Sequence, residues 1–268
     1  MEESLTTLPD TLRQQDAPGY QVFPGFAAPK IGERMLRDVI DIARAAADGA
    51  DVSPCYVAPE SQDGFSGANP EDLVSKIFKL HRRPAFADFL RDPRLQSIVI
   101  AALGPEVDCF LSQFIFKNPG AWGQPWHQDS YYFPFEPARP IIGLWLAVTE
   151  ATLENGCLHV LPGSQAEPVH RHEPDRRPGA NYGYVEITDH DMGASQPCLL
   201  QPGDLMVFDS HLMHRSTDNA SSGIRAAMVW HCCTAGTVDK GVDYGDGVRR
   251  TSPVNDWMPY LRAGQSVI

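Results

Sequence analysis

The chain has 268 residues, of which 43% are hydrophobic, 21% charged and 9% aromatic, and its formal net charge is −12. This length suits one substantial hydrophobic core, so we expect one domain rather than two. The acidic balance and the lack of long Lys and Arg runs argue against nucleic acid as a partner. No apolar run approaches the roughly 18 residues of a membrane span, and the first residues do not resemble a secretory signal. We therefore expect a cytoplasmic protein.

The six cysteines stand at positions 55, 109, 157, 198, 232 and 233. No Cys-x-x-Cys pair occurs among them, so the sequence predicts neither a zinc knuckle nor a disulfide framework. We expect reduced and mostly buried thiols.

The first part of the chain has mainly helical patterns. Residues 1–18 are polar and mixed, which predicts a loosely held N-terminal arm, whereas the alternation over 19–26 predicts a strand. Residues 48–70 are rich in Gly, Ser, Pro and Asp, and they are expected to form a long surface loop. Helical spacing of apolar residues predicts three helices, near residues 30–47, 70–80 and 84–103.

After residue 106 the pattern changes to short apolar or alternating runs separated by turns such as Asn155-Gly156 and Gly203-Asp204. Asp204 is expected to cap its turn. The predicted fold is mainly β, a double-stranded β-helix (jelly roll) with N-terminal helices packed on it. The expected division is a helical part over 28–105, a jelly-roll core over 106–235 and an irregular tail over 236–268. The predicted strands cover 108–116, 141–149, 157–161, 183–188, 197–201, 204–209 and 224–233.

A His-x-Asp motif, His127-Gln128-Asp129, is the first sign of chemistry. In a strand, residues i and i+2 point to the same face, so an imidazole and a carboxylate would lie side by side. A second imidazole from a distant strand would complete a two-histidine-one-carboxylate metal site with three open positions. The motif alone is weak evidence, because such tripeptides occur by chance.

The second histidine has several candidates, namely His159, His170, His172, His190, His211, His214 and His231. Spacing to an arginine favours His214, because Arg225 follows eleven residues later across a polar turn, and a hairpin there would place the two side by side. Arg225 would pair bidentately with a carboxylate of a dicarboxylate bound to the metal, and Ser216 could add a hydrogen bond. His211 is interpreted as a surface residue or a neighbour of the site.

With these residues in place, the chain resembles the phytanoyl-CoA dioxygenase family. The matching segments occur in the order of that family and cover roughly residues 70–235, most of the chain. They are Trp126-His127-Gln128-Asp129, the aromatic run Tyr131–Pro137, Asn155–Ser164, Gly203–Phe208 and the set His214, Ser216 and Arg225.

The resemblance implies a double-stranded β-helix that holds Fe(II) on His127, Asp129 and His214. It also implies 2-oxoglutarate and O2 as co-substrates, with release of succinate and CO2. Carried across by position, Trp145 would line the 2-oxoglutarate pocket, Lys76 would contact the co-substrate from the helical region, and Gln113 would donate a hydrogen bond to it. Gln165 stands where the family commonly has His. Any role of that His near the substrate is therefore in doubt for this chain.

Simpler interpretations exist for several of these residues. Core packing alone would explain Trp145, a solvated helix position would explain Lys76, and Arg225 could be an exposed charge at the start of a strand. The whole chain could be a non-catalytic jelly-roll binding module, although such a module would not need the three metal ligands and the arginine.

The reaction expected is hydroxylation of an unactivated C–H bond, with desaturation, epimerisation or cyclisation as the alternative. Halogenation is disfavoured because Asp129 occupies the position that chloride would need. The substrate would be an acyl-CoA or a small hydrophobic metabolite held by Tyr131, Tyr132, Phe133 and Phe135. Two basic clusters could attract the anionic acyl-CoA. They are Lys76, Lys79, His81, Arg82 and Arg83, and then His170, Arg171, His172, Arg176 and Arg177. The favoured interpretation is nevertheless that these are solvated charges, with only Lys76 functional.

Overall fold

The computed structural model describes residues 2–60, 62–180, 184–243 and 247–268. Within them the helices are α1 (Glu2–Arg13), α2 (Pro29–Ala47), α3 (Pro84–Leu90) and α4 (Pro93–Leu103), with the 3-10 turns η1 (Pro70–Leu73), η2 (Asp129–Tyr132) and η3 (Ser164–Ala166). No described helix has the length and apolar character that crossing a membrane requires.

A large antiparallel sheet forms the centre of the fold. In the described part of the chain it has nine strands, in the order β1-β11-β6-β13-β4-β17-β18, with β3 also paired to β4 and β2 paired to β3. These strands are β1 (Tyr20–Phe23), β2 (Tyr56–Pro59), β3 (Val74–Phe78), β4 (Val107–Lys117), β6 (Ile141–Ala147), β11 (Leu205–Asp209), β13 (Arg225–Thr234), β17 (Met258–Arg262) and β18 (Gln265–Ser266).

A smaller sheet faces the large one, in the order β10-β7-β12. Its strands are β7 (Leu158–Val160), β10 (Gln196–Cys198) and β12 (His214–Ser216). Three strand pairs complete the described elements, β5 (Phe135–Glu136) with β14 (Val238–Asp239), β8 (Glu173–Pro174) with β9 (Val185–Glu186), and β15 (Val242–Asp243) with β16 (Arg249–Arg250). The mainly β jelly-roll fold predicted from the sequence is confirmed, and its division into domains stays a prediction.

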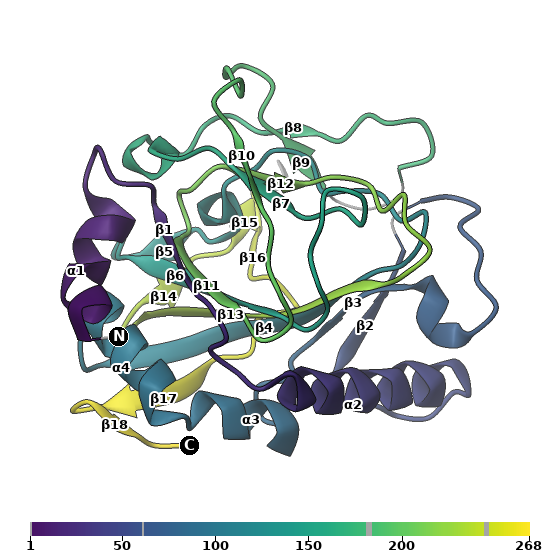
Figure 1. The fold of residues 1–268 in the computed structure, drawn as a ribbon, viewed down its shortest axis with the longest axis horizontal. Coiled ribbons are helices and arrows are strands. Elements are labelled where there is room, and N and C mark those ends of the chain that lie inside the picture. Colours follow the sequence, from purple (N-terminus) through teal and green to yellow (C-terminus); the bar gives the residue numbers. More distant parts are fainter. Residues whose placement is uncertain (1, 61, 181–183, 244–246) are drawn as a thin grey trace.

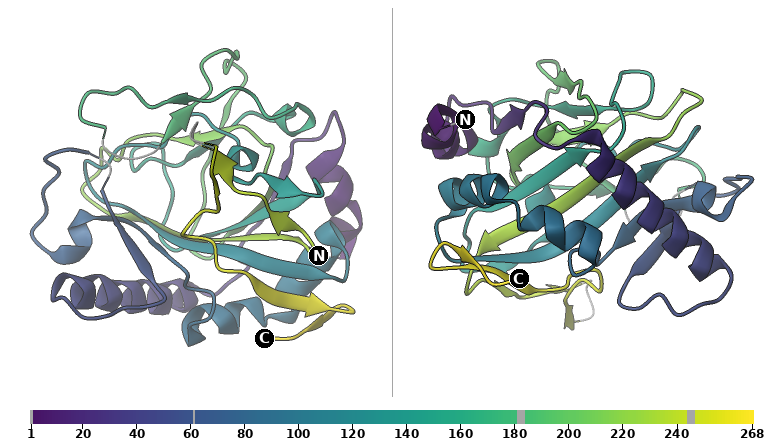
Figure 2. Two further views of the ribbon diagram at one scale, coloured as in Figure 1. Left: turned by 180° about the vertical axis from the view of Figure 1, so that it is seen from behind. Right: turned by 60° about the horizontal axis from the view of Figure 1, so that its bottom comes forward.

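The two faces of the large sheet have different neighbours because side chains alternate along each strand. On β6, Leu144 and Leu146 pack in the core that also contains α2, α3 and α4, whereas Trp145 and Ala147 pack with residues of the smaller sheet. Figure 1 and the right-hand view of Figure 2 show the helices covering one face of the sheet, while the loops around β7, β8 and β10 lie over the other. The space between the two sheets is where the site lies.

The prediction that residues 1–18 form a loosely held arm is wrong, because residues 2–13 form helix α1. Leu8 and Leu12 are fully buried in the core, and Leu5 packs against it. These leucines recur at three and four residues, which is the spacing of one helix face. The arm is therefore a packed helix rather than a loosely held segment.

The helix predicted near 70–80 is also wrong. Residues 70–73 form the 3-10 turn η1, and Val74–Phe78 form strand β3, whose five residues are all buried. A short apolar run buried on both faces cannot be told from a helix by periodicity alone. Strand β2, which pairs with β3, lies inside the region predicted to be a loop over 48–70.

Two further boundaries differ from the predictions. The helix predicted over 84–103 is two helices, because Asp92 caps α4 by accepting from the backbone N–H of Arg94, and Pro93 begins it. The tail predicted as irregular over 236–268 contains β17, which pairs with β4, and β18, which pairs with β17. Residue 183, the first of the strand predicted over 183–188, lies outside the described residues.

Candidate active site

The backbone brings the two predicted histidine ligands together. The backbone N–H of His127 donates to the carbonyl of His214 at 2.9 Å, and that of His214 donates back at 3.0 Å, so the two residues form an isolated bridge. Their ring centroids are 4.2 Å apart. His127 therefore sits beside the first residue of β12 although 86 residues of chain separate the two positions.

Asp129 completes the predicted triad. Its Oδ1 lies 3.5 Å from His127 Nε2 and 3.7 Å from His214 Nε2, and the three ligand atoms all lie within 4.8 Å of one another. The motif is not a regular strand, as the sequence argument assumed, because Asp129 already begins η2. The turn still places the carboxylate next to both imidazoles, which suits a divalent metal ion.

Hydrogen bonds to backbone carbonyls orient both imidazoles. His127 Nδ1 lies 2.8 Å from the Pro125 carbonyl and His214 Nδ1 2.9 Å from that of Leu212. A carbonyl only accepts, so each Nδ1 carries the hydrogen and each Nε2 presents a lone pair. Burial, reinforced by the neighbouring His127, lowers the pKa of His214 to about 4, which keeps its ring neutral as a metal ligand must be.

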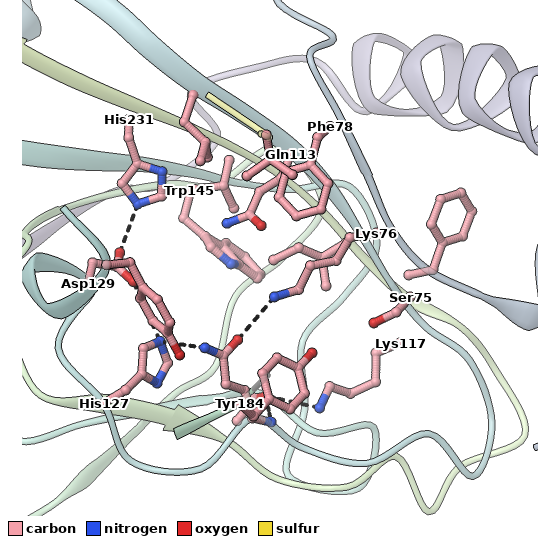
Figure 3. A pocket seen from close by; sticks show the side chains of 18 of the residues that line it. Ser75, Lys76, Phe78, Gln113, Lys117, His127, Asp129, Trp145, Tyr184 and His231 are labelled. Atoms are coloured by element: carbon pink, nitrogen blue, oxygen red, sulfur yellow. Dashed lines mark hydrogen bonds and ion pairs between the residues drawn. The ribbon is translucent and has the colours of Figure 1, made fainter. Parts of the chain in front are cut away.

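His231 supports the carboxylate, and sequence reasoning gave it no role beyond that of one more candidate ligand. Its Nε2 donates to Asp129 Oδ2 at 2.8 Å, whereas the two ligand imidazoles lie next to Oδ1. Figure 3 shows His231 and His127 on opposite sides of Asp129. Burial opposes ionisation of Asp129, but the attraction of His214 and His231 outweighs it and holds the pKa of the carboxyl well below its usual range. The arrangement keeps Asp129 charged and fixes its orientation.

The inner face of β13 carries a row of site residues. Arg225, Val229 and His231 share this face because they are separated by even numbers of residues. In the register of the sheet, Arg225 lies opposite Lys117 of β4, and Val229 lies between Gln113 of β4 and Trp145 of β6. Gln113 and Trp145, predicted only from the family resemblance, thus line the same cavity as Arg225.

Arg225 is a buried cation with free donors. Only 1% of the residue is exposed, and within the described residues neither its Nε nor its Nη1 has a hydrogen-bond partner. Its guanidinium carbon lies 5.9 Å from the centroid of the Trp145 ring. Burial lowers the pKa of Arg225 to about 10, which still leaves it charged at neutral pH. A buried, unpaired charge is costly, so this position calls for an anion such as a carboxylate.

The hairpin that was predicted to link His214 and Arg225 does not form. His214 begins β12 in the smaller sheet, and Arg225 begins β13 in the large one. The turn between them crosses from one sheet to the other, and the side chains of both residues line one cavity. The two residues therefore share the site, as predicted, but a crossing between the two sheets brings them there instead of a hairpin.

Ser216 and Lys117 are linked at the same end of the cavity. Lys117 Nζ donates to Ser216 Oγ at 2.9 Å and to the carbonyls of Trp122 and Thr217 at 3.1 and 2.7 Å. Burial, together with the nearby Arg225, pushes the pKa of Lys117 well below its usual value. Sequence reasoning missed Lys117, although its position two residues after Ile115 on an alternating strand marks it as inward-facing.

Lys76 lies in the cavity but on strand β3, not on a helix as predicted. Its Nζ donates to Gln124 Oε1 at 3.2 Å and lies 4.9 Å from the centroid of the Tyr184 ring. Gln124 in turn places its amide nitrogen 3.0 Å from His127 Nε2. Because that Nε2 has a lone pair, the Gln124 amide donates to the atom that would bind a metal.

The cavity that holds these residues has a volume of about 410 Å³. All eight residues predicted for the site line it. They are Lys76, Gln113, His127, Asp129, Trp145, His214, Ser216 and Arg225. Of the aromatic residues predicted to hold substrate, Tyr132 and Phe133 line it. Tyr131 is 40% exposed and stacks on His172, and Phe135 packs against Phe110, so these two do not.

The two basic clusters are largely neutralised by carboxylates. Arg82 pairs with Asp256 and Arg83 with Asp38. In the second cluster Arg171 and Arg176 both pair with Glu173, and about 80% of each side chain is exposed. The structure therefore favours the interpretation of these arginines as solvated surface charges.

Gln165, the departure from the family pattern, has a structural role here. Its amide nitrogen donates to the carbonyls of Gln14 and Ala17 at 3.0 and 2.9 Å. It therefore holds the segment that joins α1 to β1. Asp204 caps its turn as expected, accepting from the backbone N–H groups of Gly25 and Gln201.

The fold and the site together define a jelly-roll protein with a two-histidine-one-carboxylate face and a buried arginine beside it. A sequence model of the phytanoyl-CoA dioxygenase family matches residues 16–227. The chain belongs to this family.

Curated relatives agree with this assignment. Peroxisomal phytanoyl-CoA dioxygenase of Bos taurus is 31% identical over 171 residues, which is 62% of this chain and 51% of the relative. Phytanoyl-CoA dioxygenase domain-containing protein 1 of Rattus norvegicus is 33% identical over 180 residues, 63% of this chain and 60% of the relative. The chain thus spans about half to three fifths of the length of these relatives.

Solved structures of other proteins share the fold, among them EvdO2 and SnoN. EvdO2 from Micromonospora carbonacea var. aurantiaca, complexed with 2-oxoglutarate, matches with a TM-score of 0.60 and 21% identity, covering 90% of this chain and 93% of that one. The epimerase SnoN, in complex with Fe3+, alpha ketoglutarate and nogalamycin RO, matches with a TM-score of 0.65 and 17% identity, covering 97% and 96%.

Proposed function

We propose that this protein is an Fe(II)- and 2-oxoglutarate-dependent oxygenase that hydroxylates an unactivated C–H bond of a small organic substrate. The observation that carries the proposal is the buried guanidinium of Arg225, whose donors are free, in the same cavity as His127, Asp129 and His214. A metal triad alone would suit many functions. A triad together with a buried site for a carboxylate suits a dicarboxylate that chelates the metal at its other end.

The three ligands would hold the iron through His127 Nε2, Asp129 Oδ1 and His214 Nε2. When bound, Fe(II) would supply the activation of O2 that is coupled to decarboxylation of 2-oxoglutarate to succinate and CO2. Arg225 would receive the distal carboxylate of 2-oxoglutarate in its planar fork. Burial of that pair away from water would strengthen it.

Neighbouring side chains would orient the co-substrate. The indole N–H of Trp145, which is buried and has no described partner, would donate to it, as would the Gln113 amide. Ser216 already accepts from Lys117 and from the backbone N–H of Gln124, so its own hydroxyl hydrogen remains to be donated. Lys117 is expected to hold Ser216 in place rather than to contact the co-substrate.

For the primary substrate we favour a small hydrophobic metabolite over an acyl-CoA. A cavity of about 410 Å³ is of the size that holds a drug-like molecule, and Tyr132, Phe133 and Phe208 give it aromatic walls. The surface arginines that would attract a CoA phosphate are already paired.

Epimerisation, desaturation and cyclisation of a natural-product intermediate remain the second candidate, since a protein of the same fold, SnoN, is described as an epimerase. A non-catalytic binding module is less favoured, because it would have no use for the free donors of Arg225 beside an intact triad. We also propose a cytoplasmic location, which the free cysteines in the described chain favour.

The experiment that tests this function is a screen for succinate release. The purified protein with Fe(II), ascorbate and 2-oxoglutarate is offered neutral lipophilic compounds, free acids and acyl-CoA thioesters. We expect substrate-stimulated succinate with one of the first two classes, and product analysis by mass would identify hydroxylation by a gain of one oxygen atom. A product of unchanged or reduced mass would move the assignment to the second candidate.

A further inference from the structure

A second group of metal-binding side chains lies outside the cavity. Glu167, His170 and His190 bring one carboxylate and two imidazoles together, with their ligand atoms within 4.8 Å of one another. Glu167 Oε2 lies 2.7 Å from His170 Nε2 and 3.1 Å from His190 Nε2. Neighbouring ligand atoms of a tetrahedral zinc site are about 3.3 Å apart, given zinc–ligand bonds of about 2.0 Å.

A backbone carbonyl orients the ring of His190. His190 Nδ1 lies 3.0 Å from the Asp191 carbonyl, which only accepts, so Nδ1 carries the hydrogen. Its Nε2, which lies 3.1 Å from Glu167 Oε2, is then the ring atom available to a metal ion. The hydrogen bond on Nδ1 is also the usual support of a metal-binding histidine.

We propose that Glu167, His170 and His190 form a binding site for a divalent metal ion of the Zn²⁺ class, separate from the iron triad. Two imidazoles and one carboxylate match the protein ligands of many zinc sites, with water in the fourth position. About one fifth of each histidine side chain and 38% of the Glu167 side chain are exposed, so an ion can enter from solvent.

The ion would join Glu167 and His170, which precede the described residues 171–180, to His190, which follows the described residues 184–189. The second of these stretches forms part of the cavity wall. Within it Tyr184 lines the cavity and contacts the Lys76 ammonium. Figure 1 shows β8 and β9, which belong to these two stretches, on the side of the smaller sheet. A metal bridge between the three ligands would restrict the movement of Tyr184.

The same site is tied to the iron triad through Gln128, which lies between His127 and Asp129 in the sequence. The buried Gln128 accepts from the backbone N–H of His170 at 2.8 Å and donates to the Pro168 carbonyl at 3.1 Å. Binding at Glu167 and His170 would therefore fix the segment that Gln128 holds. We expect the second ion to be structural and to stabilise the closed wall of the cavity.

Zinc stoichiometry tests the proposal independently of catalysis. The full-length chain, stripped of metal, is dialysed against Zn²⁺ and analysed for bound metal. We expect two equivalents in the wild type, one in His214→Ala, one in Glu167→Gln/His190→Asn, and none when these changes are combined. His159→Ala, a histidine that belongs to neither group, is the matched control and should keep two.

The outcomes separate this proposal from the oxygenase function. Absence of zinc from His214→Ala, or two equivalents retained in Glu167→Gln/His190→Asn, would overturn the second site, whatever the triad does. Failure of the triad to bind metal would instead leave one equivalent in the wild type that Glu167→Gln/His190→Asn removes. Should the double variant unfold, as circular dichroism would show, Glu167→Gln alone replaces it, because this change keeps the size of an exposed side chain.

Limited proteolysis gives the structural readout. Arg171 and Arg176 lie in the described stretch 171–180 with about 80% of each side chain exposed, so trypsin has access to both. Zn²⁺ should slow cleavage at these arginines in the wild type and in His214→Ala, but not in Glu167→Gln/His190→Asn. Equal cleavage with and without Zn²⁺ in His214→Ala would contradict the proposed metal bridge.

Discussion

Arg225 lies directly opposite Lys117 across strands β13 and β4, and both side chains are buried in the same cavity. Lys117 places its three donor hydrogens on Ser216, Trp122 and Thr217, whereas Nε and Nη1 of Arg225 have no partner in the described chain. Two neighbouring cations in a buried site repel each other, and only one of them has its hydrogen bonds satisfied. Arg225 is thus the position at which an anion would be bound.

Arg225→Met is expected to weaken binding of 2-oxoglutarate by about 2–5 kcal/mol, because a charge-assisted bidentate pair is lost. Anaerobic calorimetry with the Fe(II)-loaded protein measures this loss. Ser216→Ala should act in the same direction by about 1 kcal/mol, the value of one hydrogen bond. Arg176→Met, a change at an exposed arginine, should leave binding unaltered.

The same Arg225→Met variant should be at least as resistant to thermal unfolding as the wild type when 2-oxoglutarate is absent. A buried charge without a partner destabilises the fold, and replacing it with an apolar side chain of similar length relieves that cost. Normal 2-oxoglutarate affinity in this variant, or a large loss of stability without the co-substrate, would contradict the role given to Arg225.

His231→Leu is expected to lower the affinity for Fe(II) by about 10–100-fold, because the hydrogen bond that orients Asp129 is removed. His231→Gln, whose amide can still donate, should recover part of the affinity. Competition with a colorimetric Fe(II) chelator measures both. A merely structural role would predict equal losses in the two variants, and that result would exclude positioning of Asp129 as the function of His231.

The buried side chain of His81 should make the stability of the fold depend on pH. It is fully buried, and Ser112 Oγ, which accepts from the backbone N–H groups of Leu80 and His81, gives its own hydrogen to His81 Nδ1. Burial lowers the pKa of His81 from 6.5 to about 4, although Asp256 opposes the shift. Between these pH values the unfolded chain binds a proton that the folded chain does not.

The free energy of unfolding should therefore fall as the pH is lowered from about 6.5 to about 4, with His81 contributing up to about 3 kcal/mol of the loss. Urea unfolding across this pH range measures the slope. His81→Asn, which does not titrate there, should show a shallower slope than the wild type. An unchanged slope would mean that His81 titrates alike in the folded and unfolded chains.

Charge reversal at two surface arginines tests the substrate class. Because Arg171 and Arg176 are exposed and paired with Glu173, Arg171→Glu/Arg176→Glu should leave turnover of the true substrate and binding of 2-oxoglutarate unchanged. Steady-state kinetics at low and high salt measure this. A rise in KM for an acyl-CoA that is confined to low salt would show that the arginines attract a CoA phosphate, and it would contradict the preference for a small hydrophobic metabolite.

The alternation of side chains explains how much of the site could be predicted from the sequence. Strands with a period of two assign Trp145, Gln113 and Arg225 to one face once the strands are known, and a polar residue on a buried face is noticeable. Lys117 and His231 follow the same rule on β4 and β13. Lys117 was missed, and His231 was considered only as a metal ligand, because motifs select residues by spacing along the chain, whereas these two act through neighbours on other strands.

Other features could not be predicted, because they depend on tertiary contacts. Strand β3 has an apolar run that fits a helix equally well, and only its pairing with β2 and β4 decides between them. The proximity of His214 and Arg225 was predicted through a hairpin, but the chain changes sheets between them. Glu167 and His190 are 23 residues apart with no spacing rule to connect them, so their meeting is visible only in the fold.

Anaerobic absorption spectroscopy of the Fe(II)-loaded protein with 2-oxoglutarate tests the central claim most directly. A weak visible charge-transfer band is expected in the wild type and in His211→Ala, because both retain the two histidines and Asp129 of the triad. His214→Ala should lose the band while keeping the fold, as far-ultraviolet circular dichroism would show. A band that persists in His214→Ala, or one that is lost in His211→Ala instead, would contradict the assignment of the iron site.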